Sequence, residues 1–216
     1  MSSKIRTYEG DDVIVEFDAK RCIHAEECVH GLPSVFDTNH RPWIDPSQSD
    51  ASSIVSVIQK CPTGALRYRR RDGGADESPE EETTVRIAAD GPLYVTGRIR
   101  LGLPDGSTAN DSRVAVCRCG ASKNKPYCDN SHLEAGFKDS GRIGASGMPA
   151  ADGTEAPGVQ LTPAPNGPVI LSGAVTIVGT NGQSAAGAKG ALCRCGASQN
   201  KPFCDGAHEA AGFEAD

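Results

Sequence analysis

The chain has 216 residues and a formal net charge of −6, with 38% hydrophobic and 5% aromatic side chains beside 25 glycines and 14 prolines. That composition is poorly suited to one large apolar core, so we expect two or three small units stabilised by disulfides or metals. The acidic balance argues against the basic footprint of a nucleic-acid-binding protein. No stretch approaches the ~20 apolar residues of a membrane span. We therefore expect neither nucleic acid nor a membrane as a partner.

Nine cysteines are the candidates for stabilising such units. A disulfide framework would leave one thiol over, because nine is an odd number. The first residues, MSSKIRTYEGDDVIVEF, contain no apolar run followed by a small-residue cleavage site, so they do not indicate secretion. We expect a reduced, cytoplasmic chain in which clustered cysteines form metal or redox sites.

The first part of the chain, residues 4–68, carries the strongest secondary-structure signals. The segment VIVEF at 13–17 is typical of a strand, and the apolar spacing within 47–60 predicts a helix whose start Ser47 could cap. Residues 69–83, RRRDGGADESPEEET, are charged and lack apolar periodicity, which is typical of a linker. We expect 4–68 to form a domain of its own.

The second part of the chain contains an internal repeat. The stretch CRCGASKNKPYCDNSH at 117–132 returns as CRCGASQNKPFCDGAH at 193–208, seventy-six residues later, with twelve of its sixteen positions identical. The stretch GPLYVTG at 91–97 returns at the same offset as GPVILSG at 167–173. Equal offsets at two separated places indicate one duplicated unit.

Each copy is predicted to consist of strands, a cysteine-containing loop and a short helix. The expected strands are 93–101 and 114–119 in the first copy and 169–178 and 190–195 in the second, and the expected helices lie around 132–137 and 208–213. The boundaries that follow are 84–138 for the first copy, 139–165 for a Gly/Ala/Pro-rich crossing segment and 166–216 for the second copy.

The repeated motif has the spacing Cys-x-Cys-x8-Cys-x3-His, which suits metal binding. Its ligands are Cys117, Cys119, Cys128 and His132 in the first copy and Cys193, Cys195, Cys204 and His208 in the second. Two thiolates one residue apart at a strand end can bind one iron, and the third cysteine with the histidine can bind a second. Three cysteines and a histidine also suit tetrahedral zinc, so the spacing leaves a structural zinc site open.

The residues before each short helix have their own expected roles. Asp129 and Asp205 stand where a helix N-cap belongs and are expected to accept backbone N–H bonds. Gly206 permits a left-handed turn there, and Asn130 at the equivalent position is the next most tolerant residue of that geometry.

Both motifs resemble the CDGSH (NEET-type) iron–sulfur signature, Cys-x-Cys-x2-Ser-x3-Pro-x-Cys-Asp-Gly-x-His. The resemblance implies that each motif holds one [2Fe–2S] cluster through its three cysteines and its histidine. It further implies that the matching non-ligand residues support the ligands; these are Ser122, Asp129, Ser198 and Asp205. The departures, Asn130 for Gly and Ala207 for Ser, are not ligand positions. In that family two motif-bearing units pair about a two-fold axis and exchange strands, so the resemblance predicts one β-rich domain with internal pseudo-two-fold symmetry over 84–216.

The remaining cysteines are Cys22, Cys28 and Cys61, the last followed by a proline. Bacterial-type ferredoxins use a Cys-x2-Cys-x2-Cys run with a distant Cys-Pro. This unit resembles single-cluster ferredoxins that lack one of those ligands, including divergent mono-cluster ferredoxins. Ala25 occupies the middle position of that run. The resemblance implies a [3Fe–4S] cluster on three cysteines, or a [4Fe–4S] cluster if a further group such as His24 or His30 completes the fourth iron.

The predicted fold class is therefore α+β, a ferredoxin-like domain followed by the β-rich tandem domain. All nine cysteines have a cluster role, which leaves no catalytic thiol. We expect a non-enzymatic electron carrier with two [2Fe–2S] clusters and one [3Fe–4S] or [4Fe–4S] cluster, acting between a reductase and an electron acceptor. Two alternatives stay open: a store, donor or sensor of clusters, and a zinc-stabilised interaction module.

Overall fold

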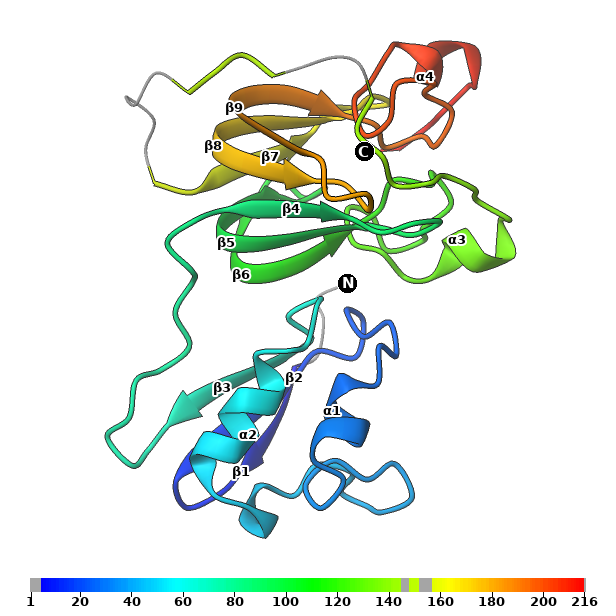
Figure 1. The fold of residues 1–216 in the computed structure, drawn as a ribbon. Helices are drawn as coiled ribbons and strands as arrows, with labels where there is room; N and C mark the ends of the chain where they lie inside the picture. The colour runs from blue at the N-terminus through cyan, green and yellow to red at the C-terminus, as the bar shows by residue number, and fades with distance from the viewer. Residues whose placement is uncertain (1–4, 145–147, 152–156, 216) are drawn as a thin grey trace. The chain divides into compact units, whose positions relative to one another are not determined.

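The computed structural model describes residues 5–144, 148–151 and 157–215 and divides into two units, Met1–Ser78 and Pro79–Asp216, each with a hydrophobic core of its own (Figure 1). Sheet predominates, and the helices are short. None of the helices among these residues is long and apolar enough to cross a membrane.

The N-terminal unit is a three-stranded antiparallel sheet covered by short helices. The strands pair in the order β1-β2-β3, so the last strand of the unit returns to lie beside the central one. The elements are β1 Arg6–Glu9, β2 Val13–Phe17, α1 Glu27–Gly31, the 3₁₀ helix η1 Pro46–Gln48, α2 Ala51–Ile58 and β3 Leu66–Arg70.

The strand predicted at 13–17 is confirmed as β2, whereas the helix predicted from 47 begins later. Ser47 belongs to η1, and the chain is extended again before α2 starts. The cap of α2 is Asp50, whose carboxylate accepts the backbone N–H of Ser53 at 2.9 Å. The capping prediction was therefore wrong in its residue: a carboxylate three positions further on satisfies the orphan N–H.

The segment predicted as a linker starts inside the sheet. β3 continues through Arg70, because Arg69 and Arg70 pair with Ile14 and Val13 of β2. The alternating burial of β3 shows that basic side chains can end a strand when only one face of it is covered.

The second unit is built from six strands. In the part that the structure describes they are β4 Thr84–Ile87, β5 Leu93–Gly102, β6 Thr108–Val116, β7 Val159–Pro163, β8 Val169–Val178 and β9 Ser184–Leu192, with the single-turn helices α3 Ser131–Glu134 and α4 Ala207–Ala210. The strand predicted at 169–178 matches β8, and the helices lie where the repeat placed them.

The strands of this unit close into a partial barrel. β5 pairs with β6 along one edge, and on its other edge it pairs first with β4 and then with β7. β8 does the same with β9, β7 and β4. β4 and β7 therefore each bridge both long strands, antiparallel to one and parallel to the other, and the enclosed side chains form the core.

A bulge lies at the point where each long strand changes partners. The register shifts between Thr96 and Ile99 in β5 and between Ser172 and Val175 in β8. Gly97 and Gly173 sit in these bulges with φ of 112° and 116°. Such φ values suit glycine, and the extra residue bends the strand so that it can follow the barrel.

β7 lies inside 139–165, where the sequence predicts only a crossing segment without strands. It occupies the place seventy-six residues after β4, yet QLTP shares little with TVRI. The reciprocal pairing of β4 with β8 and of β7 with β5 is the strand exchange expected for paired repeats. The pseudo-two-fold axis itself remains a prediction.

Both cysteine loops lie at one end of the barrel, where α3 and α4 are seen in Figure 1. β6 and β9 end one residue before Cys117 and Cys193, earlier than the predicted strands 114–119 and 190–195. The backbone N–H groups of these cysteines instead bond to Pro126 and Pro202 of their own loops. Each loop therefore folds back over the end of the strand that leads into it.

Candidate metal centres

The first cysteine loop brings its four predicted ligands together as two pairs. The Sγ atoms of Cys117 and Cys119 lie 3.7 Å apart at the end of β6. The Sγ atom of Cys128 lies 3.5 Å from Nδ1 of His132, which α3 presents from its first turn. Cys117, Cys128 and His132 are buried, so these donors face the protein and not bulk water.

The second loop repeats this geometry. Cys193 and Cys195 have their Sγ atoms 3.8 Å apart, and Cys204 Sγ lies 3.4 Å from Nδ1 of His208. Here the second pair is more open, because Cys204 and His208 are only half-buried whereas their counterparts in the first loop are buried.

These distances are those of donors that share a metal. With metal–sulfur bonds of about 2.3 Å and metal–nitrogen bonds of about 2.0–2.1 Å in a tetrahedron, two sulfurs lie about 3.8 Å apart and a sulfur and a nitrogen about 3.5 Å. One zinc ion would require all four donors within that reach. Among the residues that the structure describes, no group of three or more Cys, His, Asp or Glu surrounds one ion. Each pair is therefore spaced as two donors to one metal would be.

Backbone N–H groups of the loops point at the sulfurs. Cys128 accepts from the N–H of Asn130 at 3.5 Å, and Cys204 accepts from that of Gly206 at 3.4 Å. Asn130 and Gly206 have φ of 70° and 86°, so the predicted left-handed turns are confirmed. Such bonds stabilise a thiolate, because a negatively charged sulfur is the better acceptor.

Ser122 and Ser198 maintain the shape of the loops. Each buried hydroxyl donates to a carbonyl five residues on, Ser122 to Tyr127 at 2.6 Å and Ser198 to Phe203 at 2.7 Å. Each also accepts the N–H two residues on, at 3.1 Å and 3.0 Å. The serines therefore satisfy backbone groups that the turn would otherwise bury without partners.

Asp129 and Asp205 also bridge their loops. Each carboxylate accepts the first helical N–H at 3.0 Å, and each accepts a second N–H from residue 123 or 199 at 2.8 Å. The residues at the cap positions of α3 and α4 are Asn130 and Gly206, so the two aspartates precede the cap and do its hydrogen bonding.

Several thiols of the two motifs have pKa values shifted by their surroundings. Burial raises the pKa of Cys128 and of Cys193 to about 11 each. The Cys119 thiol donates to Cys117, which lowers the pKa of Cys117 to about 6 and raises that of Cys119. The Cys117–Cys119 pair thus keeps a proton between its sulfurs, and binding a metal must release it.

Two buried arginines were not singled out from the sequence. Arg118 and Arg194 stand between the paired cysteines of each motif and are only 1% exposed. Arg118 donates to the backbone carbonyls of two residues, whereas Arg194 donates to those of Gly167, Ala164 and Ala215. Each guanidinium lies over a phenylalanine ring, Phe137 at 5.0 Å and Phe213 at 5.2 Å. The signal that could have found them is an arginine at the x of Cys-x-Cys in both copies.

The two loops touch each other. A Cβ atom on Gly120 would lie 2.6 Å from the Cys195 carbonyl oxygen, and one on Gly196 would lie 2.8 Å from that of Cys119. Lys125 and Lys201 also cross over, each reaching the phenylalanine ring of the other copy within 6 Å. Both sites therefore belong to one interlocked structure.

The N-terminal unit gathers its three cysteines around a cavity of about 620 Å³. Burial first, and then the neighbouring Cys61 and Cys22, raise the pKa of Cys28 to about 11. Cys22 is shifted upward in pKa for the same reasons, burial first and then Cys61. Mutual repulsion of this kind shows that the three sulfurs lie within electrostatic reach of one another.

Among the histidines proposed for this unit, only His24 lines the cavity. Ala25, at the position of the missing cysteine, lines it as well. His30 has an exposed side chain and lies 3.7 Å from Glu26 on the surface of α1. The geometry therefore favours His24 over His30 as a neighbour of the three cysteines.

Comparison with known proteins agrees with this division of the chain. A family model described as a divergent 4Fe-4S mono-cluster matches residues 8–71, and one described as an iron-binding zinc finger of the CDGSH type matches residues 90–133 and 166–209. A protein of Escherichia coli K12 named "Uncharacterized protein YjdI" is 39% identical over 66 residues, which are 31% of this chain and 87% of that protein. The protein of the same name in E. coli O157:H7 gives the same values. No solved structure matches the chain.

Proposed function

The chain belongs to the family of iron–sulfur proteins with CDGSH-type and divergent 4Fe-4S mono-cluster domains, and on that premise we propose that it carries single electrons between redox proteins. Each repeat would hold one [2Fe–2S] cluster, and the N-terminal unit one [3Fe–4S] or [4Fe–4S] cluster. The ligands are the two sets of three cysteines and a histidine, and the trio Cys22, Cys28 and Cys61. Redox partners of the kind proposed are a reductase and an electron acceptor.

The observation that carries this proposal is the division of each donor set into two pairs. Cys117 with Cys119 suits one iron, and Cys128 with His132 suits the other. Two donors for each iron leave two tetrahedral positions, which the bridging sulfides of a [2Fe–2S] cluster would fill. A single zinc ion does not explain the pairing.

When bound, such clusters supply one-electron oxidation and reduction. The chain contributes two features to that chemistry. Histidine in place of a fourth cysteine removes one negative charge and raises the reduction potential, as it does in other His-ligated [2Fe–2S] centres. The close contact of the two loops at Gly120 and Gly196 supports passage of an electron between the sites.

The three sets use all nine cysteines, so no thiol is left for nucleophilic catalysis. That count supports a carrier and not an enzyme. A zinc-binding scaffold suits the ligand spacing of the repeated motifs but not the pairing of their donors, and it would give no role to the N-terminal trio.

The test is electron paramagnetic resonance of anaerobically purified protein, before and after dithionite, beside iron and sulfide analysis. The expected result is a reduced [2Fe–2S] signal equal to two clusters per chain and a separate signal from the N-terminal unit. A redox titration should place the two CDGSH clusters above about −400 mV, the value of plant-type ferredoxins. A colourless protein that contains zinc would overturn the proposal.

A second function is favoured by the openness of the second site. Cys204 and His208 are half-buried, so the second cluster would be easier to release than the first. This suits a donor or sensor of [2Fe–2S] clusters. Incubation with an apo-ferredoxin separates the two functions: a donor transfers its cluster within minutes, whereas an electron carrier keeps it.

A further inference from the structure

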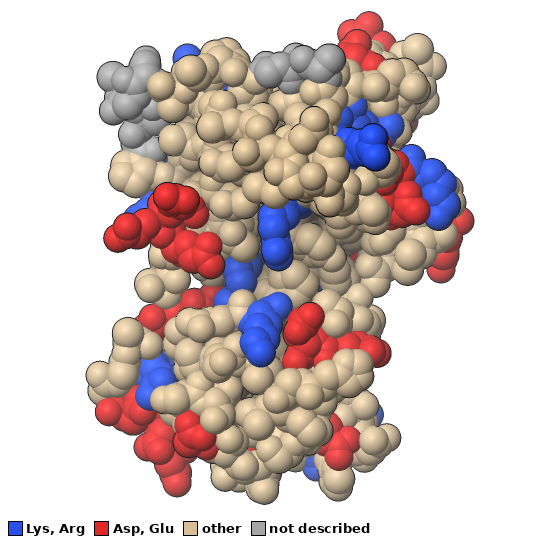
Figure 2. All heavy atoms as spheres, viewed as in Figure 1, with Lys and Arg blue, Asp and Glu red and all other residues tan. Residues whose placement is uncertain are grey.

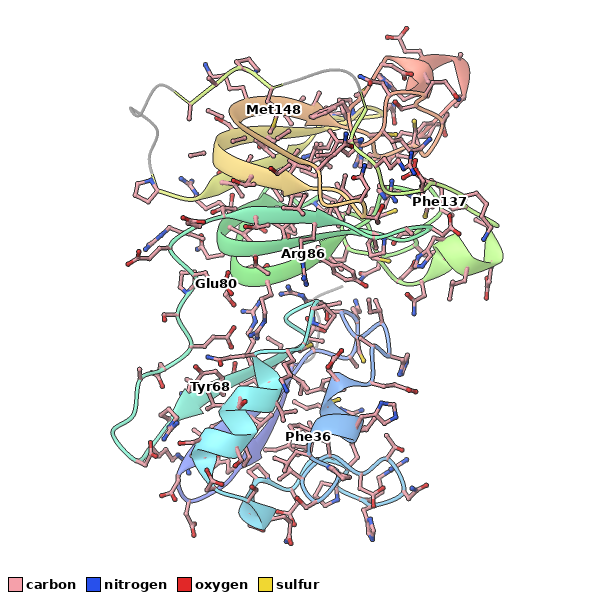
Figure 3. All side chains as sticks on the ribbon, in the orientation of Figure 1. Phe36, Tyr68, Glu80, Arg86, Phe137 and Met148 are labelled. Carbon is pink, nitrogen blue, oxygen red and sulfur yellow. The ribbon has the colours of Figure 1, made fainter. Side chains whose placement is uncertain are left out.

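The buried arginine of the first repeat lies on the chain between two proposed ligands. Arg118 donates from Nε to the Gly91 carbonyl at 2.7 Å and from Nη2 to the Ala88 carbonyl at 2.5 Å. Phe137, seen after α3 in Figure 3, covers the guanidinium. Because arginine stays protonated, the fold places a permanent positive charge beside the first site.

The carboxylate of Asp139 forms an ion pair with that guanidinium. Oδ1 of Asp139 accepts from Nη1 of Arg118 at 2.5 Å, and the Asp139 side chain is 15% exposed. Oδ1 also accepts the N–H of Gly141 at 2.9 Å, so the carboxylate is fixed in place. The position seventy-six residues on is Ala215, whose backbone carbonyl accepts from Nη2 of Arg194 at 3.2 Å.

The charge of Arg118 reaches a proposed ligand. Arg118 stands on the chain between Cys117 and Cys119, whose Sγ atoms lie 3.7 Å apart, and it is only 1% exposed. A buried positive charge favours added negative charge on groups close to it, and a partner that neutralises Arg118 must weaken that effect.

We infer that Asp139 sets the reduction potential of the first cluster, lowering it by neutralising Arg118. The inference rests on the proposed function, since it requires a cluster at Cys117, Cys119, Cys128 and His132. The step concerned adds one electron from an external one-electron donor to the cluster, and no bond is made or broken. Asp139 does not touch the proposed cluster ligands itself; it acts on the cluster by neutralising the charge of Arg118, and is therefore a positioning residue.

Neighbouring charges are poorer candidates for this role. Nζ of Lys138 lies 3.0 Å from Oδ2 of Asp90, but the two side chains are 80% and 45% exposed. Figure 2 shows charged side chains of both signs at the surface, where solvent and salt screen them. Asp90 also accepts the N–H of Asp139 at 2.8 Å, which fixes the backbone of this partly buried residue.

The experiment is a dithionite titration of full-length Asp139→Asn protein followed by electron paramagnetic resonance. Asparagine keeps the oxygen that accepts from Arg118 and Gly141 but removes the charge. The first cluster is expected to become easier to reduce by at least tenfold, which is about 59 mV for one electron. The second cluster is expected not to move. The titration is then repeated in a His208→Cys background, in which the reduction potential of the second cluster is expected to be lower. The reduction step that moves belongs to the second cluster, and the other step belongs to the first.

Two variants separate charge from structure. Asp139→Glu keeps the charge and is expected to keep the wild-type potential, and Lys138→Gln removes an exposed neighbouring charge and is expected to shift it far less. High salt should abolish the Lys138→Gln shift and preserve most of the Asp139→Asn shift. If Asp139→Asn protein fails to retain iron, the double variant Arg118→Gln/Asp139→Asn, which restores neutrality, is expected to retain it with a potential near the wild type.

Three results would overturn the inference: an Asp139→Asn shift no larger than that of Lys138→Gln, an equal shift of both clusters, or a double variant whose potential stays raised. Failure of the proposed function looks different, because wild-type protein would then lack iron or give no reducible [2Fe–2S] signal at all.

Discussion

Gly120 lies against the backbone of Cys195, so that a side chain on this glycine would collide with the ligand loop of the other repeat. Gly196 has the same relationship to Cys119. The two candidate metal sites are therefore joined by direct backbone contact, so a structural change in one loop must alter the other.

Gly120→Ala tests this contact. A Cβ at position 120 would stand 2.6 Å from a carbonyl oxygen that no side-chain rotation can move away. We expect loss of iron from both repeats and a fall in the free energy of unfolding well beyond the ~1–2 kcal/mol that a left-handed alanine costs.

Gly106→Ala is the matched control, because Gly106 has φ of 81° against 82° for Gly120, and no atom lies within 4 Å of the position that an added Cβ would take. Gly106→Ala should lower the free energy of unfolding only by the cost of an alanine in the left-handed region, without loss of iron. Equal effects of the two substitutions on iron content and unfolding would mean that contact between the loops is unimportant.

Ser198→Ala should destabilise the second loop by about 1–3 kcal/mol in chemical denaturation, the range for buried polar groups left without a partner. The substitution removes the bonds to the Phe203 carbonyl and the Asn200 N–H from a serine that is only 1% exposed. Ser107→Ala is the comparison, since Ser107 bonds to Asp105 on an exposed turn. A change for Ser198→Ala within about ±0.5 kcal/mol, the range of ordinary surface substitutions, would contradict the role of the buried hydroxyl.

Acid should release the clusters of the repeats, because protons compete with iron for the histidine nitrogen. Burial, and then Arg118, lower the pKa of His132 below its ordinary value of 6.5. Just below pH 6.5 an unfolded chain therefore binds more protons than the folded one, so stability falls as the pH falls. Visible absorbance followed against time at about pH 5 and about pH 8 measures the loss. His132→Cys and His208→Cys should slow it, and unchanged kinetics in both variants would refute ligation by histidine.

Ala25→Cys should convert the N-terminal site to four cysteines. Ala25 lines the same cavity as Cys22, Cys28 and Cys61, so a thiol there would face the cluster. We expect four irons in this unit and loss of any oxidised [3Fe–4S] signal near g = 2.01. His24→Ala is the companion variant: if it alone lowers the iron content, His24 and not an open position completes the wild-type site.

The sequence predicts that donors such as Cys128 and His132 lie close together, because ligand spacing is local and a loop of fixed length can place them in only a few ways, and the structure has them 3.5 Å apart. The partner of Arg118 could not be found that way. Asp139 lies twenty-one residues after Arg118, in a segment with no apolar periodicity. Only the folded barrel places it within hydrogen-bonding distance of Arg118. β7 was missed for a related reason, since its place depends on pairing with β5 and β8 and its four equivalent residues differ from those of β4. Near the start of α2, both Ser47 and Asp50 are of residue types that can cap a helix, and in the structure the cap is Asp50.

The exchange of β4 and β7 has a consequence for how the protein is made. While a ribosome has synthesised only the first repeat, β4 can pair with β5, but its other partner, β8, does not yet exist. The sheet around the first site is finished only after Val178 has left the exit tunnel. Nascent chains stalled before Val159 should therefore be more sensitive to protease in the first repeat than the same residues in the finished protein, and any cluster inserted that early would enter an incomplete fold.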